Sequence, residues 1–534
     1  MFHTKDHKTL NIFDPFAYLG EKRRKLLDVS WASLFREDIL PNLPVSLLTE
    51  HYDSFRGRPT KELYAMLGAV ILQEMHDLTD IETVAQFSFN IQWHYALNIT
   101  SIDDASCYVC EKSIWTMRKI ITENNLFLPI FETLTDELIK LFDVDTGKQR
   151  IDSMHIFSNM RHLGRISLFT ETIKKFLRNL KRQHLQLFNS LDKEIIERYL
   201  TKKGLSLFAA VKPSESTKTL QNVGDDLYYL IQRFAPDGIV SDMTTFKLME
   251  RLFKEQCIVG TDELTDEKVV SVKPNKDVPS DSLQSPTDPE AGYSGHKGKG
   301  YQVQVMETYD TAEEDKQLSL ITYVNVEPAN ESDANALIPA LESTIQRGVA
   351  PEEVLADTLY GSDKNYLLAE ELGIHVIAPT MGSKKKGDII PISKFTSNEK
   401  GVILSCPMGH PPNKINNKKG RHTAAFDLET CSSCPYVDEC PTKIGKNASY
   451  LRYAEKELRI DQRRAKEDTE EFTEEYRFRA GVEATMSEYD RKTNVKHSTV
   501  RGIKNISFKA ILKAIGINIY RASTFKNRQM EAEC

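Results

Sequence analysis

The chain shows two kinds of hydrophobic pattern. Between residues 60 and 142, apolar side chains recur every three or four positions, as at Leu63, Leu67 and Val70, which is the spacing of one face of an α-helix. Residues 1 to about 45 lack this spacing and are predicted to be irregular. The helices predicted from the pattern are 61–75, 80–97, 104–120 and 126–142. The N-terminal part of the chain is therefore predicted to be an all-helical domain.

Short apolar runs replace the helical spacing further along the chain. Residues 150–156 are predicted to form a strand, because Ile151, Met154 and Ile156 surround a single carboxylate. Two strands that should pair as a hairpin follow much later, and two more strands alternate with helices after them. The ranges are strands over 301–309 and 318–326, a helix over 332–346 capped by Ser332 or Asp333, a strand over 354–357, a helix over 363–372 and a strand over 374–378. This order predicts a mixed α/β sheet.

Two inserted segments separate the parts of this sheet. The first combines helices over 166–191, 225–234 and 241–255 with a loop rich in Pro, Ser and Asp over 273–289. The second is basic, rich in turn residues and holds four cysteines; helices over 455–490 and 507–520 follow it. The predicted division is a helical domain over 1–145, the first strand over 146–165, a helical insertion over 166–290, the rest of the sheet over 291–380, a Cys-rich insert over 381–450 and C-terminal helices over 451–534.

Length and charge narrow the class of protein. A chain of 534 residues is too long for one hydrophobic core and predicts two to four folding units. No apolar run approaches the ~20 residues of a membrane span, and the N-terminus lacks the apolar segment of a signal peptide, so a cytoplasmic protein is expected. The net charge of −7 by itself argues against nucleic-acid binding, but from Arg491 onward ten Lys or Arg accompany two Glu. The C-terminal end is therefore locally basic.

Three carboxylates stand out by their positions. Asp152 lies inside the strand 150–156, where a charge is costly unless it is paired or holds a metal; the alternative is that Asp152 caps a turn or a strand edge. Asp357 ends a second strand, and Glu483 lies on a C-terminal helix. Carboxylate oxygens are the ligands that Mg²⁺ prefers. Two such ions about 4 Å apart can clamp the attacking and leaving oxygens of a phosphoryl transfer.

Asp152 is expected to be the ligand shared by the two ions. Three carboxylates can hold two ions only if one of them bridges, and a central strand is the most rigid support. Asp357 is expected at the carboxyl edge of the sheet, where the ligands of open α/β sheets gather. Spacing alone supports this set weakly, since the chain holds 77 Asp and Glu.

Four cysteines crowd into the second insert. Cys431 and Cys434 form a Cys-x-x-Cys pair, which Cys406 precedes and Cys440 follows. Four thiolates at such spacing can bind a structural, tetrahedral Zn²⁺. The reserve ligands are His410 and His422. The alternative is a set of free thiols in a reducing cytosol.

Clusters of basic residues flank the predicted carboxylate site. Single runs of Lys and Arg are more often solvated surface, but several runs around one site indicate contacts to DNA phosphates. A Gly-rich turn over 292–300 could also approach a DNA backbone closely, although it does not fit the P-loop pattern. The residues predicted to contact DNA are Arg56, Arg58, His296, Lys297, Lys299, Arg491, Lys492, Lys496 and Arg501. Two further basic runs are Lys384–Lys386 and Lys414–Arg421.

Taken together, these motifs resemble DDE transposases of bacterial insertion sequences, most closely insertion sequence family eleven-eighty-two. The resemblance covers most of the chain. The motifs that carry it are Gly57-Arg58-Pro59, Trp93–Leu97, Ile151-Asp152-Ser153, Gly295–Tyr301, Ala356-Asp357 with Tyr360-Gly361-Ser362, Cys440-Pro441, and Arg479–Glu483 with Arg501-Gly502.

The resemblance implies a ribonuclease-H-like catalytic core with Asp152, Asp357 and Glu483 as ligands of two Mg²⁺ or Mn²⁺ ions. It implies hydrolysis of double-stranded DNA at the element ends, followed by attack of the freed 3′-hydroxyl on target DNA. It also implies a homodimer or larger assembly on paired ends, at the bacterial nucleoid. The family commonly has a Lys seven residues after the Glu; here that position is Asp490, and Arg491 is the expected substitute.

Two other functions remain open at this point. A DNA-binding or regulatory protein derived from a transposase would keep the fold and the zinc insert but do no chemistry. A plain metal-dependent nuclease would cut DNA without joining the 3′-hydroxyl to a second molecule. The N-terminal helical domain is expected to read the element ends.

Overall fold

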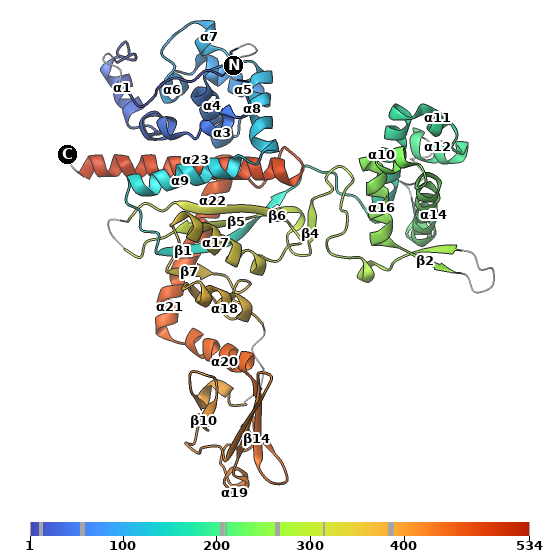
Figure 1. Ribbon diagram of the computed structural model, residues 1–534, viewed down its shortest axis with the longest axis vertical. Coiled ribbons are helices and arrows are strands. Elements are labelled where there is room, and N and C mark those ends of the chain that lie inside the picture. The colour runs from blue at the N-terminus through green and yellow to red at the C-terminus, as the bar shows by residue number, and fades with distance from the viewer. Residues whose placement is uncertain are drawn as a thin grey trace.

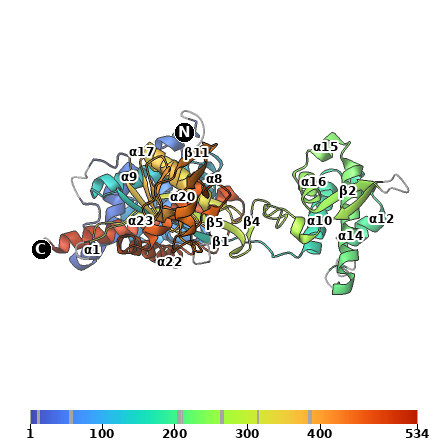
Figure 2. The same cartoon turned by 90° about the horizontal axis from the view of Figure 1, so that it is seen from below.

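The structure is a computed structural model that describes residues 2–9, 14–53, 59–202, 208, 211–261, 268–312, 316–382 and 389–532. A central body holds the N-terminal helices, the main sheet and the C-terminal helices (Figure 1). A helical unit lies to one side of this body, as both views show (Figures 1 and 2). A small β-rich unit lies at the far end from the N-terminal helices (Figure 1).

The central sheet has six strands and is mixed, as predicted. Its order is β4-β5-β1-β7-β8, and β6 pairs with β5. Strand β1 runs antiparallel to β5 and parallel to β7, which places Ile151 beside Ala356. Asp152 and Asp357 follow these two residues on neighbouring strands. The bounds are β1 Lys148–Phe157, β4 Gly292–Ser294, β5 Gly298–Thr308, β6 Ile321–Pro328, β7 Glu353–Ala356 and β8 His375–Ile377.

The chain between residues 60 and 142 is helical, as predicted, but the predicted helices 80–97 and 104–120 are each divided into two. The structure has α4 Leu63–Met75, α5 Asp80–Phe89, α6 Ile91–Ala96, α7 Asp104–Cys107, α8 Glu111–Glu123 and α9 Phe127–Leu141. Thr79 and Glu82 form a capping box at the start of α5, which satisfies two backbone N–H groups that a helix leaves unpaired.

The prediction that residues 1 to about 45 are irregular is wrong. They contain α1 (Glu21–Asp28) and α2 (Trp31–Leu34), followed by a π-helical turn over Phe35–Ile39. Each element is shorter than the window over which helical periodicity becomes visible. Phe35 and Leu27 are nevertheless buried in the same hydrophobic core as the helices that follow.

One hydrophobic core joins the two ends of the chain to the sheet. The C-terminal helix α23 (Ile503–Ala532) is much longer than predicted and contacts α4, α9 and β6. Its Ile511 and Ile515 share a core with Leu67 of α4 and with Ile156 of β1. The N-terminal helices and one face of the sheet are therefore held together through α23 (Figure 1).

The helical insertion has a core of its own. Its helices are α10 Arg165–Gln183, α11 Leu185–Asn189, α12 Lys193–Leu200, α14 Ser216–Phe234, α15 Gly238–Ser241 and α16 Thr244–Gln256. The predicted helix 166–191 is interrupted at His184. A hairpin of β2 (Cys257–Thr261) and β3 (Lys268–Val272), which was not predicted, completes the unit. Residues such as Phe176 and Leu227 form this separate core.

The predicted cap at Ser332 or Asp333 is wrong. A 3₁₀ turn over Asp333–Asn335 intervenes, and α17 spans Leu337–Arg347 without a side-chain cap. Asp333 instead accepts hydrogen bonds from Lys297 and Gln304. The helix after β7 is α18 (Asp363–Glu371), and Ser362 caps it.

The Cys-rich insert forms a small β-unit with its own core. Its main sheet has the order β11-β12-β14-β13, and Phe395, Phe426 and Leu451 lie in its core. The bounds are β9 Thr396–Ser397, β10 Ile403–Ser405, β11 Lys414–Lys418, β12 Arg421–Phe426, α19 Leu428–Ser432, β13 Lys443–Ile444 and β14 Ser449–Ala454. The predicted helical segment 455–490 consists of α20 Glu455–Glu467, α21 Glu470–Tyr476, a 3₁₀ turn over Arg477–Ala480 and α22 Gly481–Thr493.

Among the described residues, no helix is both long enough and apolar enough to cross a lipid bilayer.

Candidate functional site

Two of the predicted carboxylates lie side by side because their strands are parallel neighbours. Asp152 is in the middle of β1, and its Oδ1 accepts a hydrogen bond from the Ser153 amide at 2.8 Å. Asp357 follows the last residue of β7, and its Oδ1 accepts from the Leu359 amide at 2.8 Å. These local bonds leave the Oδ2 atom of each carboxylate to face other partners.

The third carboxylate reaches the same place from α22. Glu483 lies in the first turn of this helix, which packs against β1. Its side chain is 69% exposed, whereas the side chain of Asp152 is 15% exposed. The site therefore combines a carboxylate that is mostly withdrawn from water with one that solvent can reach.

Arg479 connects all three carboxylates. Its Nη2 atom lies 2.7 Å from Asp152 Oδ2 and 4.0 Å from Asp357 Oδ2, and its Nη1 atom lies 3.0 Å from Glu483 Oε1. Arg479 belongs to the motif Arg479–Glu483, but no role was predicted for its side chain. The signal that could have found it is the i, i+4 spacing to Glu483 on a helical segment.

A buried ion-pair network positions the helix that carries Glu483. Glu307 of β5 is fully buried and pairs with Arg150 at 2.7 Å and with Arg521 of α23 at 2.8 Å. Arg150 also donates to the carbonyl oxygen of Phe478. A Cβ at Gly481 would lie 2.1 Å from a guanidinium nitrogen of Arg150, so a larger residue there would push this guanidinium away from Glu307 and the Phe478 carbonyl oxygen. The network was not predicted from the sequence.

The electrostatics of the site centre on Asp152. Burial raises the pKa of Asp152 above the ordinary value for aspartate, and the guanidinium of Arg479 opposes this rise. The nearby charges of Asp357 and Asp333 raise this pKa further. A nearby cation stabilises the ionised form of a buried carboxylate such as Asp152, and Arg479 supplies that cation in this structure.

The three carboxylates fit a divalent ion by their chemistry but not by their present arrangement. They offer only hard oxygen donors, as Mg²⁺ requires, and they already share one cation. However, no group of three or more His, Cys, Asp or Glu in the part of the chain that the structure describes could hold a metal ion as the side chains stand. The guanidinium of Arg479 would have to withdraw before an ion could take its contacts.

The four cysteines of the insert line one small cavity. Cys406, Cys431, Cys434 and Cys440 surround a space of about 40 Å³, and His410 also lines it. Burial raises the pKa of Cys431, and the three other thiols contribute to this rise. The four thiols line the same cavity and are therefore close enough to one another to gain from a shared cation. As these described side chains stand, the four cysteines do not form a group that could hold a metal ion.

His422 is committed elsewhere, against the prediction that it is a reserve ligand. Its buried ring stacks on Tyr453 at 5.1 Å and its Nε2 lies 2.9 Å from Glu455 Oε1. It does not line the cysteine cavity.

The residues predicted to contact DNA fall into different environments. Arg56 and Arg58 lie outside the described residues, as does the run Lys384–Lys386. His296 and Arg491 are exposed. The others have partners within the chain, which are Ser153 and Asp333 for Lys297, the Leu163 carbonyl for Lys299, Glu488 for Lys492, Asp490 for Lys496 and the Asn159 carbonyl for Arg501.

Much of the C-terminal basicity is neutralised inside the protein. Lys513 pairs with Asp77 at 2.8 Å, and Lys526 contacts Glu37 and Asp38 at 3.0 Å each. Arg521 belongs to the buried network around Glu307. These cations attach α23 to the rest of the body, so the positive charge counted in the sequence overstates the surface that DNA could use.

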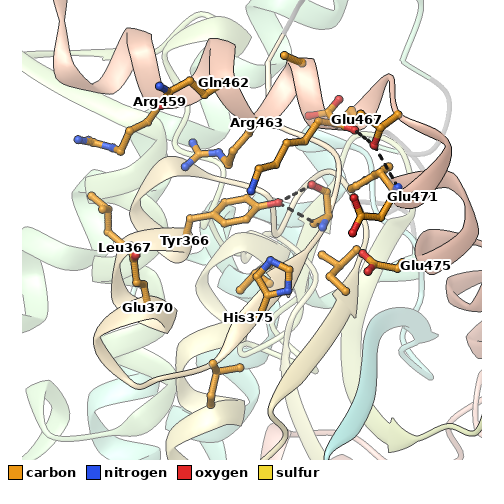
Figure 3. Close-up of a pocket in the computed structure, with 18 of the residues that line it drawn as sticks. Tyr366, Leu367, Glu370, His375, Arg459, Gln462, Arg463, Glu467, Glu471 and Glu475 are labelled. Atoms are coloured by element: carbon orange, nitrogen blue, oxygen red, sulfur yellow. Dashed lines mark hydrogen bonds between the residues drawn. The ribbon is translucent and has the colours of Figure 1, made fainter. Parts of the chain in front are cut away.

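A cavity of about 960 Å³ lies apart from the three carboxylates. It opens between the edge strand β8, α18 and the helices α20 and α21, with residues such as Tyr366, His375 and Arg463 around it (Figure 3). None of the three carboxylates lines it. Arg459 and Arg463 on its wall pair with Asp363, which fixes α20 against α18.

Comparison with protein families gives two matches. Residues 405–523 match the family described as "Transposase DDE domain", and residues 32–119 match the family described as "Transposase domain (DUF772)". The first match includes the four cysteines, Arg479 and Glu483, and the second covers helices α4 to α6. No curated protein and no solved structure matches the chain. The chain is thus similar to transposases in these two segments, and the segment similar to the DDE domain contains Glu483 but neither Asp152 nor Asp357.

Proposed function

We propose that this protein is a metal-dependent DNA transposase of the kind found in insertion sequence family eleven-eighty-two. It binds the ends of its element, hydrolyses the phosphodiester bond at each boundary and joins the 3′-hydroxyl to target DNA. The observation that carries the proposal is the meeting of Asp152, Asp357 and Glu483 around one guanidinium. The transposase matches at both ends of the chain agree with it.

Asp152, Asp357 and Glu483 would hold two Mg²⁺ or Mn²⁺ ions. When bound, the ions supply the positive charge that activates the attacking oxygen and stabilises the leaving one. Asp152, on the central strand, would be the shared ligand. Before the ions bind, Arg479 keeps the three carboxylates together. Its positive charge also opposes protonation of Asp152, because it lowers the pKa of Asp152 that burial raises. Glu483 is exposed enough to turn toward a ligand without disturbing the core.

The Cys-rich unit would be stabilised by one Zn²⁺ bound to Cys406, Cys431, Cys434 and Cys440. Four thiols around one cavity are the donor set of a closed, structural zinc site. The hydrophobic core of this unit is small, and small units commonly depend on a metal for stability.

The DNA would lie across the carboxylate site. A homodimer or larger assembly of the protein would bring the two element ends together. His296, Lys297, Lys299, Arg491, Lys492, Lys496 and Arg501 are the proposed phosphate contacts among described residues, with Arg56 and Arg58 on the N-terminal domain. We propose the same domain division as the sequence predicts, with residues 1–145 reading the element ends.

A second candidate function is a DNA-binding or regulatory protein without catalysis. The observation that favours it is that the described carboxylates, as they stand, could not hold a metal ion. In this case Arg479 would be a permanent structural cation.

A strand-joining assay separates these functions. The purified protein is incubated with a labelled duplex that carries the element's own end, a supercoiled target plasmid and Mg²⁺. A transposase converts labelled 3′-hydroxyl ends into covalent plasmid joints. Cleavage without joints would identify a nuclease, and binding without cleavage would identify the silent DNA-binding protein.

A further inference from the structure

The turn between β4 and β5 folds back over the sheet. In the register of the sheet, Gly300 pairs with Phe157 at the far end of β1. Lys297, three residues earlier on the turn, nevertheless reaches back to Ser153, with its Nζ 2.8 Å from Ser153 Oγ. Gly300 permits this path, because its φ is +150° and a Cβ there would lie 2.2 Å from the Ile156 carbonyl oxygen. The ammonium of Lys297 is thereby placed beside the residue that follows Asp152.

Asp333 holds this ammonium from a fixed position. Its Oδ2 lies 3.3 Å from Lys297 Nζ, and its Oδ1 accepts a hydrogen bond from Gln304 Nε2 at 2.9 Å. Gln304 is held in turn by the hydroxyl of Tyr360, which donates to its Oε1 at 2.6 Å. Asp333, Gln304 and Tyr360 are all buried. Both oxygens of Asp333 are therefore committed, and the carboxylate has little freedom to move.

Lys297 keeps the capacity to bind a further anion. A lysine ammonium has three donor hydrogens, and two of them face Ser153 and Asp333. About a third of the Lys297 side chain is exposed, at 32%, while the Asp333 side chain is 8% exposed. An ammonium that is aimed by a buried carboxylate and open on one side is a site for a phosphate oxygen.

We propose that Lys297 binds the DNA phosphate next to the three carboxylates and that Asp333 is the positioning residue that aims it. The inference deepens the proposed function and rests on it. Asp333 itself touches neither DNA nor a reacting atom; it acts through Lys297. The buried chain from Tyr360 through Gln304 to Asp333 holds the ammonium beside Ser153, one residue along β1 from Asp152.

Two explanations of Asp333 predict different effects of replacing it, one based on its charge alone and one based on its positioning of Lys297. Removing a negative charge beside a DNA-binding surface should tighten DNA binding if only Coulomb attraction matters. If Asp333 positions Lys297, Asp333→Asn instead lowers the turnover number kcat by about tenfold to a hundredfold, because small misplacements of a positioning group have effects of this size. KM should change far less than kcat.

The experiment compares Lys297→Met, Asp333→Asn and the double variant with the wild type. Cleavage of a labelled duplex carrying the element end is measured as kcat and KM with Mg²⁺, and binding of the same duplex is measured by fluorescence anisotropy in chelator at several salt concentrations. Lys297→Met should reduce the slope of log K against log salt by about 1. The double variant should be no slower than Lys297→Met, and Lys297→Arg should keep part of the activity.

A matched ion pair serves as the control. Lys247 and Asp242 are 3.1 Å apart in the helical insertion, both exposed, and Lys247→Met and Asp242→Asn should leave all readouts unchanged. Thermal unfolding of each variant shows whether Asp333→Asn still folds. If Asp333→Asn does not fold, Lys297→Met, which lies on an accessible turn, still tests the role of the Lys297–Asp333 pair.

The inference is overturned if the wild type cleaves and Asp333→Asn only tightens binding, or if the effects of the two single variants add in the double variant. Unchanged activity of Lys297→Met overturns it as well. A wild type that neither binds nor cleaves the duplex would instead overturn the proposed function, and this inference with it.

Discussion

The Nη2 atom of Arg479 lies 2.7 Å from Oδ2 of Asp152, and the same guanidinium reaches Asp357 and Glu483. One side chain therefore occupies the place between three carboxylates that come from β1, from the end of β7 and from α22. In the proposed transposase, a divalent ion and Arg479 compete for the same carboxylates. The competition makes Arg479 a direct probe of the site.

Arg479→Gln should bind Mg²⁺ more tightly than the wild type, by about tenfold, which corresponds to about 1.4 kcal/mol. In chelator the same variant should be less stable by about 1.5–3 kcal/mol, because the carboxylates lose charged hydrogen bonds. Isothermal titration calorimetry gives the affinity, and thermal unfolding gives the stability.

Arg477→Gln is the matched control for this substitution. Arg477 lies on the same 3₁₀ turn but pairs with Glu474 at the surface, so neither the Mg²⁺ affinity nor the stability should change. Equal Mg²⁺ affinity in the wild type and Arg479→Gln would contradict the competition.

Glu307→Gln should destabilise the protein strongly. Glu307 is fully buried between Arg150 and Arg521, and removing one partner of a buried ion pair leaves uncompensated charge at a cost of about 3–5 kcal/mol. The midpoint of thermal unfolding should fall by roughly 5–10 °C. Glu137→Gln, in an exposed pair with Lys140, should shift the midpoint by less than about 2 °C; similar shifts in both variants would refute the structural role of the network.

Stability should fall as the pH drops from about 6.5 to 4 because of His76. Burial lowers the pKa of His76 to about 4, and its ring lies against Trp31 and Trp93 near the hydroxyl of Tyr520. Between these pH values the unfolded chain binds a proton that the folded protein does not, so unfolding is favoured as the pH falls. Full protonation would cost about 3 kcal/mol.

The check is thermal unfolding across this pH range in the wild type and His76→Gln. The variant should show a shallower decline, and His162→Gln, at an exposed site, should decline like the wild type. A decline of the same steepness in all three proteins would rule out His76 as the cause.

Purified protein should contain one Zn²⁺ per chain by elemental analysis. The double variant Cys431→Ser/Cys434→Ser should lose this zinc and unfold at a lower temperature, because a closed thiolate site contributes directly to folding. Cys107→Ser/Cys110→Ser, the other Cys-x-x-Cys pair of the chain, should keep the zinc. Wild-type protein without zinc would show that the four cysteines are free thiols.

The sequence predicted the main elements of the sheet because their periodic or apolar patterns are long. Strand β1 and helices α4 and α9 lie close to their predicted ranges. The short helices α1 and α2 and the β2–β3 hairpin were missed, since a few residues do not show a period. Helix α23 is longer than predicted because its burial comes from two sides, and its hydrophobic stripe is correspondingly less distinct.

Of the residues around the candidate carboxylate site, only the carboxylates themselves could be predicted from the sequence. Asp152 and Asp357 could be placed because each lies in or directly after an apolar strand. The contacts of Arg479 and the pairing of Glu307 with Arg521 join residues far apart in the sequence, and no local pattern records them. Ser332 or Asp333 was predicted as a helix cap because a polar residue just before a helix is typical of one; Asp333 is instead bound to Gln304 and Lys297, which are distant in the sequence.

The most direct test of the account is metal-dependent strand cleavage by wild type and Asp152→Asn. Both proteins are incubated with a labelled duplex carrying the element's own end, once with Mg²⁺ and once with chelator, and binding of the duplex is measured alongside. The proposed transposase should nick the duplex at the element boundary only when both Mg²⁺ and Asp152 are present, and Asp152→Asn should still bind the DNA. Cleavage by Asp152→Asn at the wild-type rate, or folded wild-type protein that binds the end without ever nicking it, would contradict the account.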